Sequence, residues 1–419
     1  MKVHGRRRVP GDKSISHRAL IFGALAMGPS RLTGLLTSAD VQSTAGMLRA
    51  LGLVIPAIGA EPVTVTGGGP AGLRVPLDVL DAGNSGTTAR LMSGVLAARP
   101  FRSRMIGDAS LSKRPMARVS APLTEMGAKF EFESGTHLPM AITGGALRGL
   151  TWRSESASAQ IKSALLLAAF TAGVPVEVHE PALSRDHTER MMRGRGVDVR
   201  SEGTVATLIP GKPMSALDVA VPGDPSSAAF FTALAALATG GEIELPGVCA
   251  NPGRTGAFRV LDRMGARISW EDMTDEGGEP VGTIIAAPRV LTGTTITPDE
   301  IPSLIDELPV LACVAARSAG ETRVTGAEEL RVKESDRIAL VVKNLRAIGA
   351  DAEELPDGFV VRGTDRPFKG RIETEGDHRI AMAFGILGAA TGGLIEIDDR
   401  DCVGVSYPAF WTDLGEACS

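Results

Sequence analysis

Residues 9–28, VPGDKSISHRALIFGALAMG, and residues 221–240, VPGDPSSAAFFTALAALATG, are two versions of one pattern. Each version begins with Val-Pro-Gly-Asp and runs into a stretch of small apolar residues. A polar residue followed by such a stretch predicts a buried helix whose amino end lies at the polar residue. In the first copy, Ser14 and Ser16 are the plausible N-caps.

Positively charged residues crowd the predicted start of the first helix, where Lys13, His17 and Arg18 lie within one and a half turns. The helix macrodipole is already positive at that end, so it disfavours cations. A bound anion removes the conflict, because exposed backbone N–H groups and cations then share its charge. The pattern therefore indicates a site for a multiply charged anion.

The same Ala-rich helix recurs six times along the chain. Counted between Ser14, Ser85, Ser158, Ser226, Asp306 and His378, the intervals are 71, 73, 68, 80 and 72 residues. A short strand follows each helix, and a second helix ending at a glycine turn follows five of the strands. Self-similarity at a fixed period indicates a repeat architecture, here an α/β fold of six units.

Six units of this length divide naturally into two domains of three units each. We expect the seam at the second Val-Pro-Gly-Asp, with residues 12–222 forming an inserted domain. Residues 1–11 and 223–419 then form a discontinuous domain, because the first ten residues return to complete it. The final copy is either truncated or takes its last strand from elsewhere. The alternative to a domain seam at Val-Pro-Gly-Asp is that these four residues form only a turn followed by a helix cap.

Composition narrows the class of protein. The chain has 419 residues, a net charge of −5 and 43% hydrophobic residues, which is ordinary for a globular protein and argues against nucleic acid as the main partner. It has no signal-peptide pattern and no apolar run long enough to cross a membrane, so we expect a cytoplasmic protein. Its cysteines and histidines form no metal-binding cluster, and no nucleotide-binding loop is present. We therefore expect neither a metal nor a cofactor.

If three equivalent helices in each domain run parallel, their amino ends converge, and six positive helix ends then face the gap between the domains. The residues at these ends differ from copy to copy. Asp306 and Glu307 are the ambiguous pair, since carboxylates at a helix start are also explained by the dipole alone. The candidate residues at these ends and in adjoining loops include Lys13, Arg18, Asn84, Gly86, Arg114, Ser158, Gln160, Lys333, Arg337, Asp377, His378 and Arg379.

Several segments together resemble the enolpyruvyl transferase family, and within it the members that act on shikimate 3-phosphate. The resemblance runs from residue 10 to 410 in the family's order. The segments NSGTTARL and SAQIKSALLLA are similar in sequence to those of the bacterial class II subgroup. That subgroup is associated with tolerance of glyphosate. The matching segments are PGDKSISHR, DAGNSGTTARL, GDASLSKRPM, SAQIKSALLLA, SRDHTERM, VKESDRI, GDHRIAMAF and VSYPAF.

The resemblance implies two domains, each of three βαβαββ units with parallel helices, and an active site in the cleft between them. It also implies transfer of the enolpyruvyl group of phosphoenolpyruvate to the 5-hydroxyl of shikimate 3-phosphate, with release of phosphate through a tetrahedral intermediate. This reaction belongs to the shikimate route to aromatic amino acids. We expect a monomer with these two small molecules as its partners.

Residue roles also follow from the resemblance. Asp306 is the preferred base, and Lys13, Glu334 and His378 are the candidates for moving the proton of the methylene carbon. The residues implied for shikimate 3-phosphate are Lys13, Ser14, Arg18, Ser158, Ala159, Gln160, Ser184, Asp306 and Lys333. Those implied for phosphoenolpyruvate are Lys13, Gly86, Arg114, Gln160, Arg337 and Arg379.

Two positions depart from the family pattern: Val405 replaces a lysine found in many members, and Ala159 replaces a serine. Both departures concern contacts with the substrates and not the activity that the resemblance implies. One rival is the related enzyme that acts on UDP-N-acetylglucosamine. Its members have a reactive cysteine in the loop that corresponds to residues 107–115, and this chain has none there. A second rival is a repeat protein that binds a phosphorylated ligand without catalysis, for which an acid and a base are not expected.

Overall fold

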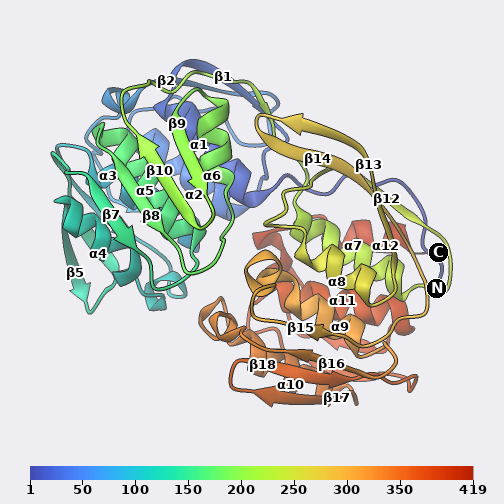
Figure 1. Ribbon diagram of the computed structural model, residues 1–419. Coiled ribbons are helices and arrows are strands. Elements are labelled where there is room, and N and C mark those ends of the chain that lie inside the picture. Colours follow the sequence, from blue (N-terminus) through green and yellow to red (C-terminus); the bar gives the residue numbers. More distant parts are fainter. Residues whose placement is uncertain (419) are drawn as a thin grey trace. The chain divides into compact units, whose positions relative to one another are not determined.

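The computed structural model describes residues 1–418, and the chain divides into two units (Figure 1). Unit 1 comprises residues 1–10, 222–274 and the chain from 280 onward, and unit 2 comprises residues 11–221 and 275–279. These limits lie one residue before the predicted ones at both crossings. The short segment 275–279 groups with unit 2, where Glu279 is hydrogen-bonded to His187 at 2.8 Å.

The second and third repeats of unit 2 have the same order of elements. The second comprises β3 (Leu80–Asp81), α3 (Gly86–Ala97), β4 (Arg102–Ile106), α4 (Ala117–Met126), β5 (Lys129–Ser134) and β6 (His137–Thr143). The third comprises β7 (Leu150–Arg153), α5 (Ala159–Ala172), β8 (Val176–His179), α6 (His187–Gly194), β9 (Asp198–Glu202) and β10 (Val205–Ile209). Their sheets have the orders β3-β4-β6-β5 and β7-β8-β10-β9, in which only the first pair is parallel.

The first repeat of unit 2 is completed by a strand from the far end of that unit. It comprises α1 (Lys13–Leu25), β1 (Met27–Thr33), α2 (Ala39–Ala50) and β2 (Val63–Gly68). Its parallel partner strand is β11 (Val219–Ala220), which pairs with β1 in a sheet of order β11-β1-β2. The three repeats therefore share one plan, and the first is closed by residues that come almost 200 positions later.

Unit 1 follows the same plan. Its elements are α7 (Pro225–Leu237), β12 (Ile243–Cys249), α8 (Gly256–Arg263), β13 (Arg267–Glu276), β14 (Glu279–Ala287), β15 (Thr295–Ile296), α9 (Leu308–Ala315), β16 (Glu321–Val324), α10 (Arg337–Ala347), β17 (Asp351–Leu355), β18 (Gly358–Arg362), β19 (Gly370–Ile372), α11 (His378–Thr391), β20 (Ile395–Ile397) and α12 (Phe410–Ala417). The sheets have the orders β12-β14-β13, β15-β16-β18-β17 and β19-β20. The predicted α/β fold is confirmed.

The first residues of the chain pair at both ends of unit 1. Val3 forms a parallel bridge with Gly241 and an antiparallel bridge with Cys418, and Arg6 forms a parallel bridge with Glu244. The extended segment thereby lies beside β12, where a first strand of the repeat belongs. It also reaches the end of the truncated last repeat.

One helix from each repeat lies in the core of its unit, covered on all sides. Such helices carry small apolar residues all round, as the Ala-rich runs require. In unit 2, α3 and α5 pack closely because Gly94 has no side chain: a Cβ there would lie 2.1 Å from the Ala164 carbonyl oxygen. In unit 1, α7, α9 and α11 pack on one another (Figure 1). Among the described residues, no helix is long and apolar enough to cross a membrane.

The predicted cap of the first helix is wrong. Asp12, not Ser14 or Ser16, caps α1, because its carboxylate accepts a 2.8 Å hydrogen bond from the Ile15 amide. Ser14 and Ser16 lie inside the helix. A carboxylate satisfies an exposed N–H and also complements the positive helix end, which a hydroxyl does not. Asp224 and Asp377 cap α7 and α11 in the same way.

Candidate active site

In unit 2, hydrogen bonds bring together the amino ends of helices that are far apart in sequence. Gln160 at the start of α5 donates to Thr87 in the first turn of α3 at 3.0 Å. His17 in α1 is hydrogen-bonded to Thr44 in α2 at 2.7 Å, and Thr44 to Thr88 in α3 at 2.7 Å. Hydrogen bonds therefore connect α1, α3 and α5 near their starts into one polar cluster within this unit, part of which is buried.

The two cations of α1 are held differently. Lys13 is partly exposed, with its Nζ 3.1 Å from the Asp40 carboxylate. Arg18 is buried, and its guanidinium donates to Thr188 at 2.8 Å and to Ser163 at 2.7 Å. It also donates to the Ser14 carbonyl at 2.9 Å. Burial lowers the pKa of Arg18 to about 10, so it remains charged at neutral pH. Lys13 is thus the more accessible cation of the two.

Gly86 lies where two guanidinium groups approach the start of α3. A Cβ at this position would lie 2.7 Å from Arg90 Nη1 and 3.6 Å from Arg114 Nη1. Arg114 donates to Asn84 at 3.2 Å, and Arg90 donates to Gln160 at 2.9 Å. The sequence reasoning did not select Arg90. Its place one turn after Gly86, in the same helix, was the available signal.

The third repeat places its predicted residues on two segments of unit 2. Ser158 has an extended backbone and immediately precedes α5, and Ala159 is the first residue of that helix. Ser184 lies in the loop between β8 and α6, and its hydroxyl donates to the Glu180 carboxylate at 2.9 Å. The Ser184 hydroxyl is therefore held by a carboxylate that no sequence argument selected.

In unit 1, three cations surround Asp306. Its Oδ1 lies 3.4 Å from Arg337 Nη1 and 3.6 Å from Lys333 Nζ. Its Oδ2 lies 3.8 Å from Arg379 Nη2, and the same arginine donates to the Asp306 carbonyl at 3.2 Å. Asp306 belongs to the short 3₁₀ segment Ile305–Glu307, which leads into α9. Three segments distant in sequence thus meet at one carboxylate.

Arg337 is the buried centre of this cluster. Its guanidinium contacts Asp377 at 2.8 and 3.2 Å and Glu334 at 2.5 Å. Burial acts to lower the pKa of Arg337, but the charges of Asp377 and Glu334 raise it above its ordinary value. Burial likewise acts to raise the pKa of Asp377, and the charge of Arg337 more than offsets this, so the pKa is lowered. Both groups are therefore charged in the folded protein.

The cluster extends to α7, and one of its members, Arg254, was missed by the sequence reasoning. Arg379 Nη1 lies 3.7 Å from Glu307 Oε1, which also accepts a short hydrogen bond from Ser226. Arg254, which is buried, donates to Ser226 at 3.0 Å and to Asp224 at 2.8 Å. His378 begins α11 and is buried. No motif marked Arg254, because its partners lie 28 and 30 residues earlier, at the start of α7.

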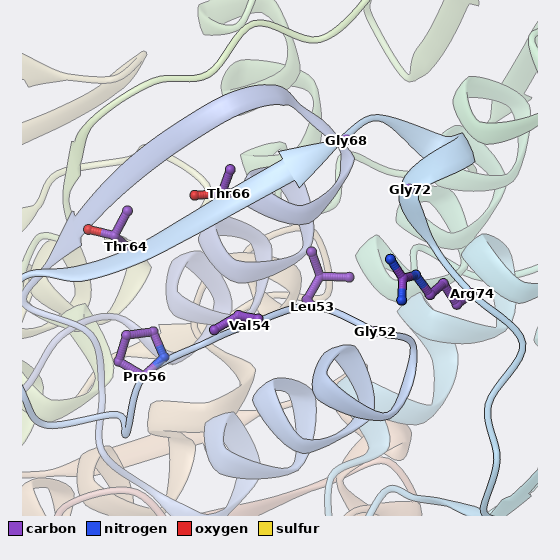
Figure 2. A pocket seen from close by; sticks show the side chains of 9 residues that line it. All are labelled: Gly52, Leu53, Val54, Pro56, Thr64, Thr66, Gly68, Gly72 and Arg74. Atoms are coloured by element: carbon purple, nitrogen blue, oxygen red, sulfur yellow. The ribbon is translucent and has the colours of Figure 1, made fainter.

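A hollow of about 370 Å³ lies elsewhere in unit 2, beside β2 in the first repeat (Figure 2). Figure 2 shows Thr64 and Thr66 on β2 opposite the segment that carries Leu53 and Val54. The hollow lies at the β2 edge of a three-stranded sheet. The corresponding sheets of the second and third repeats have a fourth strand at this edge. None of the predicted site residues lines it. We therefore base the candidate site on the two polar clusters and not on this hollow.

A sequence model of the EPSP synthase (3-phosphoshikimate 1-carboxyvinyltransferase) family matches residues 1–414. The chain belongs to the EPSP synthase family. The 3-phosphoshikimate 1-carboxyvinyltransferase of Aquifex aeolicus is 48% identical over 419 residues, which cover 99% of this chain and 97% of the relative. The predicted family and enzyme class are confirmed.

Solved structures agree with the EPSP synthase assignment. EPSP synthase from Acinetobacter baumannii superposes with a TM-score of 0.90 at 42% identity, covering 100% of this chain and 96% of that one. The enolpyruvyl transferase NikO from Streptomyces tendae has a TM-score of 0.76 at 18% identity, covering 99% and 95%. The second likeness concerns the fold alone, and it matches the fold predicted for the whole chain.

Proposed function

We propose that this member of the EPSP synthase family transfers the enolpyruvyl group of phosphoenolpyruvate to the 5-hydroxyl of shikimate 3-phosphate and releases phosphate. One observation besides family membership carries the proposal. The carboxylates of Asp306 and Glu334 lie 3.4 and 2.5 Å from the same guanidinium, that of Arg337. Two carboxylates held beside one cation supply the acid and the base that a purely binding protein does not need.

The chemistry assigns a task to each proton-transfer group. Asp306 removes the proton of the 5-hydroxyl while a proton is added to the methylene carbon of phosphoenolpyruvate, which becomes a methyl group. The tetrahedral intermediate then loses a methyl proton and inorganic phosphate, which restores the double bond. Lys13, Glu334 and His378 are the groups proposed for the methylene proton. Each proton added in the first step is returned in the second, so no redox partner is required.

Binding is proposed to use both polar clusters. Lys13, Ser14, Arg18, Ser158, Ala159, Gln160 and Ser184 from unit 2 hold shikimate 3-phosphate together with Asp306 and Lys333 from unit 1. Phosphoenolpyruvate is held by Lys13, Gly86, Arg114 and Gln160 from unit 2 with Arg337 and Arg379 from unit 1. Arginine suits carboxylate and phosphate because its planar fork donates two parallel hydrogen bonds. The proposal therefore requires that both units contribute to one active site.

We further propose that the enzyme works as a monomer in the cytoplasm. All four cysteines are free thiols, as is usual in a reducing compartment. Burial raises the pKa of Cys402 to about 12, so this thiol is not a thiolate nucleophile at neutral pH. A nucleophilic cysteine is therefore not part of the proposed mechanism.

The test is a phosphate-release assay with purified protein, phosphoenolpyruvate and shikimate 3-phosphate, without added metal. We expect release that depends on both substrates and stops when either is left out. UDP-N-acetylglucosamine replaces shikimate 3-phosphate as the control acceptor and should support none. Asp306→Asn should abolish release, and release that persists in this variant would remove Asp306 from the mechanism. Binding of both ligands without release would leave a binding protein as the correct description.

A further inference from the structure

A lysine that the proposed mechanism does not use is buried in unit 2. Lys162 lies in the first turn of α5 and is 4% exposed. Its Nζ lies 2.7 Å from Glu180 Oε2 and 2.9 Å from Glu189 Oε1. Burial acts to lower the pKa of Lys162, but the two carboxylates raise it above the ordinary value. Lysine is rarely buried without such partners, so the three charges depend on one another.

Glu180, whose carboxylate pairs with Lys162, also binds Ser184, which is predicted to contact the substrate. The same Oε2 atom of Glu180 accepts hydrogen bonds from Lys162 Nζ at 2.7 Å and from Ser184 Oγ at 2.9 Å. Glu180 is 6% exposed, and its other oxygen is buried without a hydrogen-bond partner. Lys162 is thus the cation nearest to the group that orients Ser184.

The second carboxylate connects the lysine to the buried arginine. Glu189 follows Thr188, whose hydroxyl accepts from Arg18 Nε at 2.8 Å. Ser163, the neighbour of Lys162, accepts from Arg18 Nη2 at 2.7 Å. Arg18 and Ser184 are both proposed to hold shikimate 3-phosphate, and neither is proposed to hold phosphoenolpyruvate. The network therefore concerns one of the two substrates.

We propose that Lys162, acting through Glu180, is a positioning residue for shikimate 3-phosphate binding at Ser184. The lysine neutralises Glu180, which keeps a free negative charge away from an anionic ligand. It also fixes the carboxylate that orients the Ser184 hydroxyl, while the oxygen of that hydroxyl keeps its capacity for further hydrogen bonds. Without the lysine, Glu180 repels the ligand and retains the hydroxyl more strongly. This inference rests on the proposed function, since it assumes shikimate 3-phosphate as the ligand.

The first experiment compares steady-state kinetics of Lys162→Met and the wild-type enzyme. We expect the KM for shikimate 3-phosphate to rise roughly tenfold or more, and the KM for phosphoenolpyruvate and kcat to change by less than about threefold. The matched control is Arg195→Met. Arg195 is 1% exposed, directly follows α6 in the same unit, and donates to Ser215 and Leu217 carbonyls at 3.4 Å. Loss of this buried cation should lower the melting temperature without moving either KM.

Rescue separates positioning from a structural role. The double variant Lys162→Met/Glu180→Gln removes the charges of Lys162 and Glu180, leaves Glu189 near the charge of Arg18, and keeps an oxygen that can accept from Ser184. We expect it to recover most of the lost affinity for shikimate 3-phosphate. If Lys162→Met does not fold, Glu180→Ala breaks the same link from the other side and should raise the same KM. Equal rises in both KM values, or no rise in either variant, would overturn the proposal.

Titration calorimetry with shikimate 3-phosphate as the only ligand separates the proposed function from the proposed positioning role of Lys162. If the wild-type protein does not bind shikimate 3-phosphate, the proposed function fails and the positioning role fails with it. If the wild-type protein binds and Lys162→Met binds equally well, only the positioning role fails. Binding that weakens about tenfold in Lys162→Met and not in Arg195→Met is the expected result.

Discussion

Arg337 donates two hydrogen bonds to Asp377, at 2.8 and 3.2 Å, and Asp377 in turn caps helix α11. One ion pair therefore joins the start of α10 to the start of α11 in adjacent repeats of unit 1. Both side chains are buried, so the pair is isolated from solvent. The same guanidinium faces Asp306 and Glu334, which makes this pair the support of the proposed acid and base.

Replacing Arg337 with methionine should impair both stability and activity. Loss of the guanidinium leaves Asp377 buried without its main cation, which costs about 3–5 kcal/mol in comparable buried pairs. Urea unfolding measures this loss. The double variant Arg337→Met/Asp377→Asn should recover much of the stability and none of the turnover. Recovery of turnover would show that Arg337 has only a structural role.

Glu334→Gln should reduce turnover roughly a hundredfold or more, the usual contribution of a general acid or base. The melting temperature of this variant should stay close to that of the wild type. Glu334 is partly exposed, and Arg337 keeps its ion pairs with Asp306 and Asp377. Glu328→Gln, an exposed carboxylate of the preceding 3₁₀ segment, is the control and should leave turnover unchanged. A drop in stability without loss of turnover would contradict the assignment.

Lys13→Met should also reduce turnover by about two orders of magnitude or more if this lysine handles a proton. Asp40 loses its 3.1 Å ion pair in this variant, so the melting temperature should fall modestly. Lys13→Met/Asp40→Asn should restore the melting temperature while turnover stays low. Turnover that returns together with stability would assign Lys13 a purely structural role.

His17 should make the wild-type protein less stable in acid. Burial lowers the pKa of His17 to about 3, whereas the unfolded chain takes up the proton near 6.5. The unfolded state is therefore favoured as pH falls from about 6.5 to about 3, at up to about 1.4 kcal/mol per pH unit. His17→Gln should flatten the unfolding free energy over this range, and the exposed His4→Gln should not. Parallel profiles for wild type and His17→Gln would contradict the prediction.

Val405→Lys should tighten phosphoenolpyruvate binding. Val405 ends the 3₁₀ segment Asp401–Val405, which packs on α11. One added cation near an anion is expected to lower the KM for phosphoenolpyruvate about two- to fivefold. Val405→Met matches the length without the charge. An unchanged KM in Val405→Lys would show that this position does not contact the donor substrate.

Much of the fold was predictable because it is repeated. Six Ala-rich helices at nearly constant intervals indicated the plan, and the helices of each unit do pack on one another. The caps were less predictable, since Ser14 and Asp12 are both good cap residues and only the backbone conformation distinguishes them. The Asp12 carboxylate is favoured by the positive helix end.

The predicted site residues came from motifs, whereas their partners did not. Glu180 and Arg254 lie in no motif, and Glu189 lies in SRDHTERM without having been selected, because each meets its partner only after segments distant in sequence have packed together. The pairing of Lys162 with two carboxylates is a consequence of burial, which a single sequence does not display. Positioning residues of this kind are therefore found only once tertiary contacts are known.

The bridges of Val3 with Gly241 and Cys418 constrain how the polypeptide is made as well as how it is held together. As the chain leaves the ribosome, the sheet of the first repeat can close when β11 emerges, but the bridge of Val3 with Cys418 must wait until Cys418 has been translated. Val3 thus finds this partner only after the whole of unit 1 up to Cys418 has been made. A short deletion at either terminus should consequently damage the same unit.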